Sequence, residues 1–214
     1  MHHVKNKIIV FVLVWWISNV LSFPEVYFSP DDNVRSKLIT LIRQEQDSIK
    51  MAVYLITDKG IVEELGKAKE RGVEVEVVAD VLSVDKNWGK VLLLKEYDIP
   101  VYVYDGGSQS IMHNKFFIFT KNKDDKKLLW TGSYNPTQKA DRYNRENVII
   151  EDNESMITAF EHEFNRLKKI SRRVHHRAKH TQEEPATQDQ IRRWKKYVEL
   201  TVTELIDCLN KILW

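Results

Sequence analysis

Hydrophobic positions in the middle of the chain switch repeatedly between helical and strand-like spacing. Short β-rich apolar stretches predict strands at 25–28, 48–56, 73–81 and 101–104. Apolar residues that recur every three or four positions predict helices at 32–47, 59–71 and 88–97. Because strands and helices alternate, the pattern favours a layered α/β/α sandwich.

The second half of this region changes character. Three closely spaced apolar stretches predict strands at 114–119, 127–131 and 147–150, so the central sheet is expected to be mixed. A helix at 156–167 is expected to close a catalytic domain that covers 25–169. A basic and polar linker at 171–190 and an amphipathic C-terminal helix at 191–214 follow. That helix packs on the domain or on a second copy, or it lies on a membrane surface.

The first residues carry a targeting pattern. Lys5 and Lys7 precede an apolar run that is broken by Ser18 and Asn19. The run is about fifteen residues long, below the roughly twenty that span a bilayer. Residues 1–23 are therefore expected to be a signal peptide, a membrane anchor or, as a third alternative, a buried helix. The first two place the protein outside the cytoplasm (periplasmic or secreted) or on a membrane.

Composition narrows the class of protein. The chain has 214 residues, of which 43% are hydrophobic and 30% charged, as in a globular protein. The net charge of +2 gives no strong overall field, so charge has to be examined locally. Cys208 is the single cysteine, which excludes an intrachain disulfide and a cysteine-based zinc site.

Candidate chemistry begins with a histidine and a lysine at the start of an apolar strand. His113 and Lys115 are two residues apart, so alternation along a strand puts them on one face. A fixed cation beside a histidine suits attack on an anion, because the cation offsets the repulsion between the anion and a nucleophile. The alternative is a solvent-facing polar edge.

Two further polar groups stand at strand edges. Gly132 would let the backbone approach a ligand, and Ser133 and Asn135 offer uncharged donors to phosphate oxygens. Glu146 can accept a hydrogen bond from a histidine ring and thereby fix its tautomer. An ordinary turn and a surface carboxylate are the competing interpretations.

The three groups in this order resemble the phospholipase D superfamily. His-x-Lys at 113–115, Gly-Ser-x-Asn at 132–135 and Asn-x-Glu-Asn at 144–147 carry the resemblance, which covers about 25–169. The sequence is similar to the small single-motif members, namely bacterial endonucleases and the mitochondrial cardiolipin hydrolase/Zucchini group. One position departs from the pattern. Thr120 stands where the family has a supporting aspartate, and Asp124 and Asp125 lie close by in the sequence.

The resemblance implies a two-step displacement without metal or other cofactor. His113 attacks phosphorus, and a second histidine protonates the leaving oxygen and then activates water. Since the chain holds a single motif, the second histidine is expected to be His113 of another copy in a homodimer. The supporting catalytic residues implied are Lys115, Asn135, Ser133 and Glu146. Residues expected to bind substrate are Gly132, Tyr134, Asn144 and Arg145.

Nucleic acid is the favoured substrate, with phospholipid as the alternative. Basic residues that could follow a phosphate backbone are Arg142, Arg145, Lys168, Lys169, Arg172, Arg173, Arg177 and Lys179. Tyr134 or Tyr143 could stack on a base. The apolar N-terminus and Trp194 and Trp214 of the C-terminal helix could instead place the site at a membrane. A third hypothesis, a non-catalytic binding module, has only Thr120 in its favour.

Overall fold

The computed structural model describes residues 24–84, 89–107 and 110–174. The predicted signal or anchor at 1–23 and the predicted C-terminal helix at 191–214 lie outside the described residues. Within the described part, no helix is long and apolar enough to span a bilayer.

An eight-stranded sheet forms the centre of the domain, in the order β1-β7-β6-β5-β2-β3-β4-β8. Its strands are β1 (Glu25–Ser29), β2 (Ser48–Val53), β3 (Glu74–Asp80), β4 (Val101–Tyr104), β5 (Lys115–Phe119), β6 (Leu128–Gly132), β7 (Glu146–Glu151) and β8 (Arg172–Val174). The β2–β3 and β3–β4 pairs are parallel, and the other pairs are antiparallel. The prediction of a mixed sheet is confirmed.

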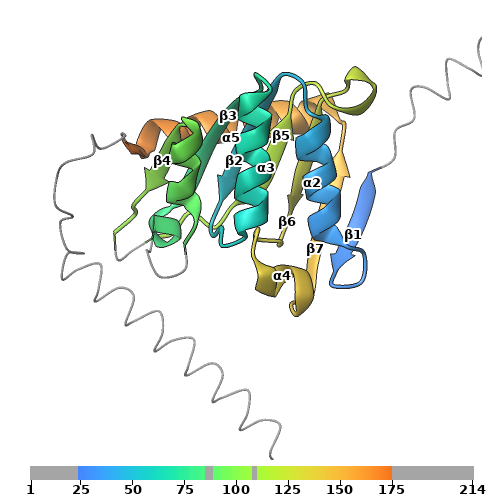
Figure 1. Cartoon of the computed structure of the whole chain (residues 1–214), viewed down its shortest axis with the longest axis horizontal. Helices are drawn as coiled ribbons and strands as arrows, with labels where there is room; N and C mark the ends of the chain where they lie inside the picture. The colour runs from blue at the N-terminus through green and yellow to red at the C-terminus, as the bar shows by residue number, and fades with distance from the viewer. Residues whose placement is uncertain (1–23, 85–88, 108–109, 175–214) are drawn as a thin grey trace, which may run out of the picture. The chain divides into compact units, whose positions relative to one another are not determined.

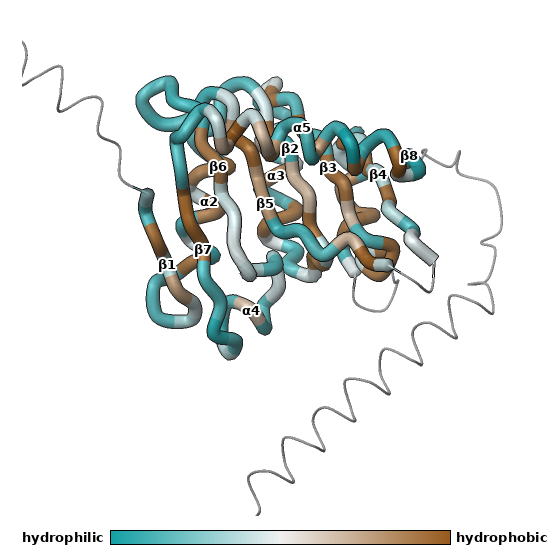
Figure 2. The backbone as a smooth tube through the Cα atoms, turned by 180° about the vertical axis from the view of Figure 1, so that it is seen from behind, coloured by the Kyte–Doolittle hydropathy of each residue, from teal (hydrophilic) through white to brown (hydrophobic). Residues whose placement is uncertain are grey.

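Helices cover both faces of this sheet (Figure 1). One face carries α2 (Val34–Gln44) and α3 (Lys59–Glu70), and α5 (Glu154–Ile170) runs across the other face (Figure 2). Two apolar clusters fill the two interfaces. The predicted α/β/α sandwich is therefore confirmed.

Strand β5 shows why the central stretches read as continuous apolar runs. All five of its residues are buried, because successive side chains enter opposite cores. Phe117 and Phe119 belong to the cluster under α2 and α3, whereas Phe116 and Ile118 belong to the cluster under α5.

Two predicted elements differ from the structure. The helix expected at 88–97 is a 3₁₀ helix, η2 (Val91–Tyr97); the other short 3₁₀ turns are η1 (Val81–Val84) and η3 (Lys123–Asp125). The stretch assigned to a linker begins with β8, where Arg173 lies opposite Tyr102 of β4. This strand has a polar sequence because it forms the outer edge of the sheet.

Strand directions gather the candidate residues at one end of the sheet. Because β2 and β5 are antiparallel, the residues after Val53 lie beside those before Lys115. The end of β6 and the start of β7 meet in the same way, since Gly132 lies opposite Val148. The short helix α4 (Gln138–Arg142) lies in the connection between these two strands, at the same end (Figure 1).

Candidate active site

His113 and Lys115 form the centre of the site. The Lys115 side chain is only 6% exposed, and its Nζ donates a hydrogen bond of 2.6 Å to the backbone oxygen of His113. Loss of solvent lowers the pKa of Lys115 to about 8, although the charges of Glu146 and Asp80 oppose this shift. The Lys115 amine is therefore mostly protonated at neutral pH. Protein groups at fixed positions replace part of its hydration shell.

The His113 imidazole favours its neutral form. Partial desolvation is the largest cause that lowers its pKa, and the neighbouring Lys115 charge adds to it, while Glu146 acts in the opposite direction. A neutral imidazole has the lone pair that a nucleophile needs, and this ring is exposed to solvent at the end of the sheet.

Ser133 and Asn135 are held by hydrogen bonds that their oxygens accept. The Asn135 Oδ1 accepts from the Leu55 backbone N–H at 3.2 Å, which fixes the amide and leaves Nδ2 to donate. The Ser133 Oγ accepts from the Asn147 N–H at 3.0 Å, so its hydroxyl hydrogen can point elsewhere. Uncharged donors anchored in this way match the needs of a phosphate oxygen.

The charge of Glu146 acts on both His113 and Lys115. Its Oε1 accepts from Asn144 Nδ2 at 2.9 Å, and the Asn144 backbone oxygen in turn accepts from the Ser29 hydroxyl at 3.1 Å. The carboxylate favours the protonated forms of His113 and Lys115. Asn144 therefore positions Glu146, and the substrate binding expected of Asn144 stays a prediction.

Tyr134 does not play the role expected from the sequence, and Gly132 has a structural role as well. Tyr134 is fully buried, with its ring edge-on to Trp130, so it cannot stack on a ligand. Burial of the aromatic ring stabilises the fold and therefore favours an inward-pointing side chain. At Gly132 an added Cβ would stand 2.1 Å from the Asn147 backbone oxygen. The close approach of β7 therefore requires a glycine here, and the substrate binding expected of Gly132 stays a prediction.

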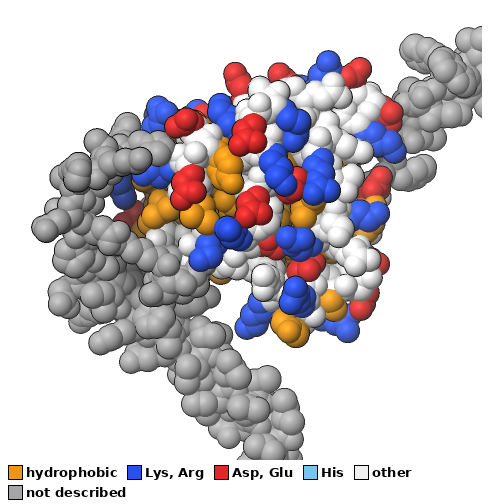
Figure 3. Space-filling view, in the orientation of Figure 1, with side chains coloured by type: hydrophobic (Ala, Val, Ile, Leu, Met, Phe, Trp, Pro, Cys, Tyr) orange, Lys and Arg blue, Asp and Glu red, His pale blue; other side chains and the backbone are white. Residues whose placement is uncertain are grey.

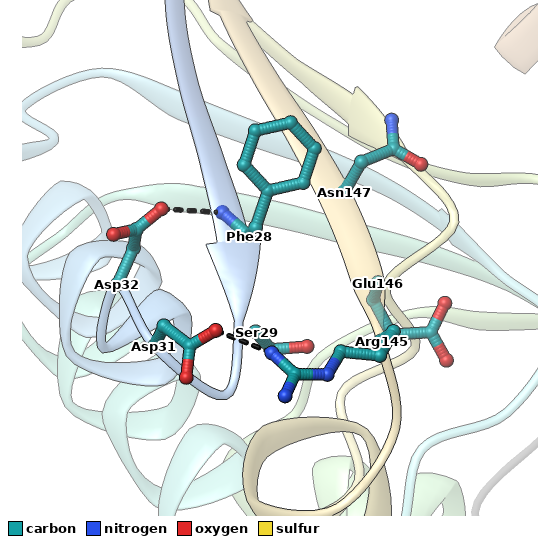
Figure 4. Close-up of a pocket in the computed structure, with 7 residues that line it drawn as sticks. All are labelled: Phe28, Ser29, Asp31, Asp32, Arg145, Glu146 and Asn147. Carbon is teal, nitrogen blue, oxygen red and sulfur yellow. Dashed lines mark hydrogen bonds and ion pairs between the residues drawn. The ribbon is translucent and has the colours of Figure 1, made fainter.

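Arg145 lies in a surface depression beside the site (Figure 4). It forms an ion pair with Asp31, and both side chains are exposed. The depression is lined by Phe28, Ser29, Asp31, Asp32, Arg145, Glu146 and Asn147. Because it contains both signs of charge, a phosphate there would have to compete with Asp31 for the guanidinium.

The predicted basic cluster is divided by the sheet order. Arg142 and Arg145 lie near α4, at the end of the sheet where the site is. Arg172 and Arg173 are on β8 at the opposite edge from β1, and Lys168 pairs with Glu76. Arg177 and Lys179 are outside the described residues. The described basic residues therefore do not form one continuous track.

Thr120 lies at the opposite end of β5 from the site, just after the strand. Its Oγ1 donates to Asp47 Oδ2 at 2.7 Å and accepts from the Ser48 N–H at 2.9 Å. Asp125, a candidate substitute for the motif aspartate, instead pairs with Lys121 at 3.6 Å. The threonine thus joins the end of β5 to the start of β2, and a nearby carboxylate supplies the charge.

Two further residues, which no sequence motif marked as part of the site, support the centre. Asp80 is buried at the end of β3 and accepts from the Met112 N–H at 2.8 Å, which fixes the backbone just before His113. Tyr54 follows β2 and places its ring 4.7 Å from the His113 ring, centroid to centroid. Asp80 ends β3 and Tyr54 follows β2, so both lie at the carboxyl ends of parallel strands, where ligand sites of α/β sheets gather.

Metal ligands are not concentrated at the site. Among the residues described here, no three histidine, cysteine, aspartate or glutamate side chains come together in a way that could hold an ion.

Known proteins with similar sequences share this domain. A family model described as "Cardiolipin synthase, PLD-like domain" matches residues 38–168. A phospholipase D of Rickettsia typhi is 32% identical over 149 residues, which cover 69% of each chain. The human mitochondrial cardiolipin hydrolase is 30% identical over 137 residues, which cover 64% of this chain and 51% of that protein.

Two solved structures share the fold. Nuc of Salmonella typhimurium, described as a phospholipase D family member, superposes with a TM-score of 0.62 and 25% identity, over 71% of this chain and 97% of that one. NucT from Helicobacter pylori superposes with a TM-score of 0.63 and 20% identity, over 70% and 97%. In both comparisons the matched part of this chain spans nearly the whole of the solved chain.

Proposed function

This chain belongs to the phospholipase D-like family and is a hydrolase of its phosphodiesterase type, and we propose that it cleaves nucleic acid through a phosphohistidine at a site shared by two copies. One observation carries the proposal. A histidine that favours its neutral form stands beside a desolvated ammonium and two anchored neutral donors, all at one end of the sheet.

The proposed reaction has two displacements. In the first, a ring nitrogen of His113 bonds to phosphorus, and the leaving oxygen departs with a proton from the second histidine. In the second, water attacks phosphorus, gives its proton to that second histidine and releases His113. Lys115, Ser133 and Asn135 stabilise the charge on the phosphate oxygens in both steps. No metal ion takes part in this scheme, and full activity in excess chelator is the expected result.

The proposal of a homodimer rests on the supply of histidines and on the surface beside the site. The other described histidine, His162, is on α5, which covers one face of the sheet. A second histidine from another copy would meet the first across a twofold axis. Phe28 and Ile111 are each 54% exposed. Phe28 lines the depression that also contains Glu146, and Ile111 lies two residues before His113 in the sequence. Such apolar side chains at the rim suit contact with a second copy.

The surface around α4 supports nucleic acid as the substrate. Tyr143 is 76% exposed, and Lys139 and Arg142 precede it on exposed positions of the same short helix. Several Lys and Arg side chains lie at this end of the molecule, together with some Asp and Glu side chains (Figure 3). An exposed aromatic ring between cations, next to a phosphate site, fits a base and the phosphates on either side of it.

Phospholipid is the second candidate, because relatives carry the names phospholipase D and mitochondrial cardiolipin hydrolase. The purified full chain should be assayed on single-stranded DNA, single-stranded RNA, and vesicles of phosphatidylcholine or cardiolipin. Cleavage of nucleic acid with intact vesicles is expected. Hydrolysis of lipid alone would overturn the choice of substrate but not the chemistry.

The covalent step has its own test. Reactions with ³²P-labelled substrate, quenched with alkali and detergent because phosphohistidine is labile in acid, should leave label on a peptide that contains His113, and His113→Asn should leave none. An active enzyme without labelled histidine in rapid-quench experiments would refute the phosphohistidine. A strictly monomeric protein with full activity would refute the shared site.

A further inference from the structure

The backbone that follows β2 is hydrogen-bonded to two of the segments that form the proposed phosphate site. The Tyr54 N–H donates to the Asn114 backbone oxygen at 2.9 Å, between the histidine and the lysine. The next residue, Leu55, binds the Asn135 amide. The segment is itself clamped by the buried Ser83 hydroxyl, which donates to the Tyr54 oxygen at 3.0 Å and accepts from the Ile56 N–H at 3.2 Å. It is a fixed platform.

The Tyr54 ring contacts the two central residues. It lies 4.7 Å from the His113 ring with an interplanar angle of 60°, which is an edge-to-face arrangement. The Lys115 Nζ lies 5.1 Å from the centroid of the same ring, within the range of a cation–π interaction. One aromatic side chain therefore contacts both the nucleophile and the cation.

Tyr54 is not there to fill the core. The ring is only 6% exposed, yet among the buried apolar residues of the described chain it is the one that belongs to neither apolar cluster. Its burial comes from the site itself. A tyrosine whose burial served only stability would contact the cores under the helices.

We propose that Tyr54 is a positioning residue, whose ring sets the orientation of the His113 imidazole and holds the Lys115 ammonium in its charged form at a fixed place beside it. The proposal rests on the roles given above to His113 and Lys115. An edge-to-face contact restricts rotation of the imidazole, and the π face favours the ammonium over the amine. Asp80 and Ser83 fix the backbone on either side, and the hydrogen bond from Lys115 Nζ to the His113 oxygen joins the two residues. The ring adds a contact to both side chains.

Two substitutions separate the ring from its hydroxyl. Tyr54→Phe keeps the ring and should retain kcat within about threefold, whereas Tyr54→Leu should lower kcat by about 10- to 100-fold with little change in KM, as expected for misoriented reacting groups. Tyr102→Leu is the matched control, because Tyr102 underlies Lys168 at 5.0 Å in the same kind of contact, remote from the site. Equal kcat for Tyr54→Leu and the control would overturn the proposal.

A readout that does not depend on turnover keeps the test independent of the proposed function. The titration of Lys115 can be followed by ¹³C NMR of its ε-carbon. Its midpoint should lie about 0.5 to 1 pH unit lower in Tyr54→Leu than in the wild type, because the cation–π contact is lost. The His113 ring protons should also lose their ring-current shift. Both signals should be unchanged in Tyr54→Phe. If the wild type cleaved nothing, these shifts would still be expected, so the two failures can be told apart.

If Tyr54→Leu does not fold, 3,5-difluorophenylalanine at position 54 replaces it, because fluorine weakens the π face at nearly constant shape. The Lys115 titration should then move to lower pH relative to Tyr54→Phe. An unmoved titration would show that the ring does not act on the ammonium.

Discussion

The two ends of strand β5 have opposite characters. At the Lys115 end, a nearly buried ammonium has a lowered pKa, and the neutral donors of Ser133 and Asn135 keep hydrogens available. At the Thr120 end, the hydroxyl both donates to Asp47 and accepts from the Ser48 backbone, so its hydrogen-bonding capacity is used within the protein.

The difference separates function from support. A site that binds an anion needs hydrogen-bond donors without a protein acceptor and a positive charge that the protein does not fully neutralise. Both features lower the local stability of the fold. The opposite end has no such demand and is satisfied internally. Glu45 illustrates this, because its Oε1 accepts from the backbone N–H groups of Asp47, Ser48 and Lys121. The loss of the family's aspartate at position 120 therefore falls on the supporting end.

The sharpest way to break this comparison is to remove the nucleophile. His113→Asn should lower turnover by at least about 10⁴-fold, as losses of a nucleophile or its base do in other enzymes. Mixing this variant with wild type, after subunit exchange, should make activity fall with the square of the wild-type fraction. A linear fall in steady-state assays would mean that each copy works alone.

Tyr143→Ala tests the nucleic-acid surface at the active end. The loss of base stacking should lower kcat/KM on single-stranded DNA by about 5- to 100-fold. Hydrolysis of bis(4-nitrophenyl) phosphate, which is too small to reach the ring, should stay unchanged and serves as the control. An equal loss on both substrates would indicate damage to the centre itself.

Glu146→Gln should shift the pH dependence. The carboxylate raises the pKa of both His113 and Lys115, so without its charge each releases its proton at lower pH. The pH optimum should therefore move to lower pH, and maximal kcat should fall by about 10-fold, since general acid catalysis is weakened. A pH profile of kcat measures both effects, and a shift to higher pH would contradict the assignment.

Thr120→Val should have the smallest effect on activity. It should lower the free energy of unfolding by about 1 to 3 kcal/mol, because the Ser48 N–H and Asp47 lose a partner, while kcat stays within about twofold. Thr120→Asp alone should also destabilise, since the new carboxylate meets Asp47, and Asp47→Asn should restore stability in the double variant. Urea denaturation measures both. A large loss of kcat in the stable double variant would show that this end takes part in chemistry.

Local pattern was enough for most of the fold. The central strands and the two long helices before β3 follow from periodicity, because each depends on neighbours in the chain, whereas the chemistry of the His-x-Lys and Gly-Ser-x-Asn groups is implied by the resemblance to the phospholipase D superfamily. Local pattern did not distinguish the buried Tyr134 from the exposed Tyr143. Two tyrosines nine residues apart looked equivalent, and only packing against Trp130 decided that Tyr134 is internal and Tyr143 exposed.

The amino-acid sequence by itself determined the layered fold and the strand that presents His113 and Lys115, and its resemblance to the phospholipase D superfamily indicated the kind of chemistry they suit. Tertiary structure alone decided that Gly132 serves the approach of β7, that Thr120 is supported by Asp47, and that the Tyr54 ring contacts both central residues. The physical reason is range. Periodicity reports contacts a few residues apart, whereas these contacts join strands that are distant in the chain and meet only when the sheet has formed.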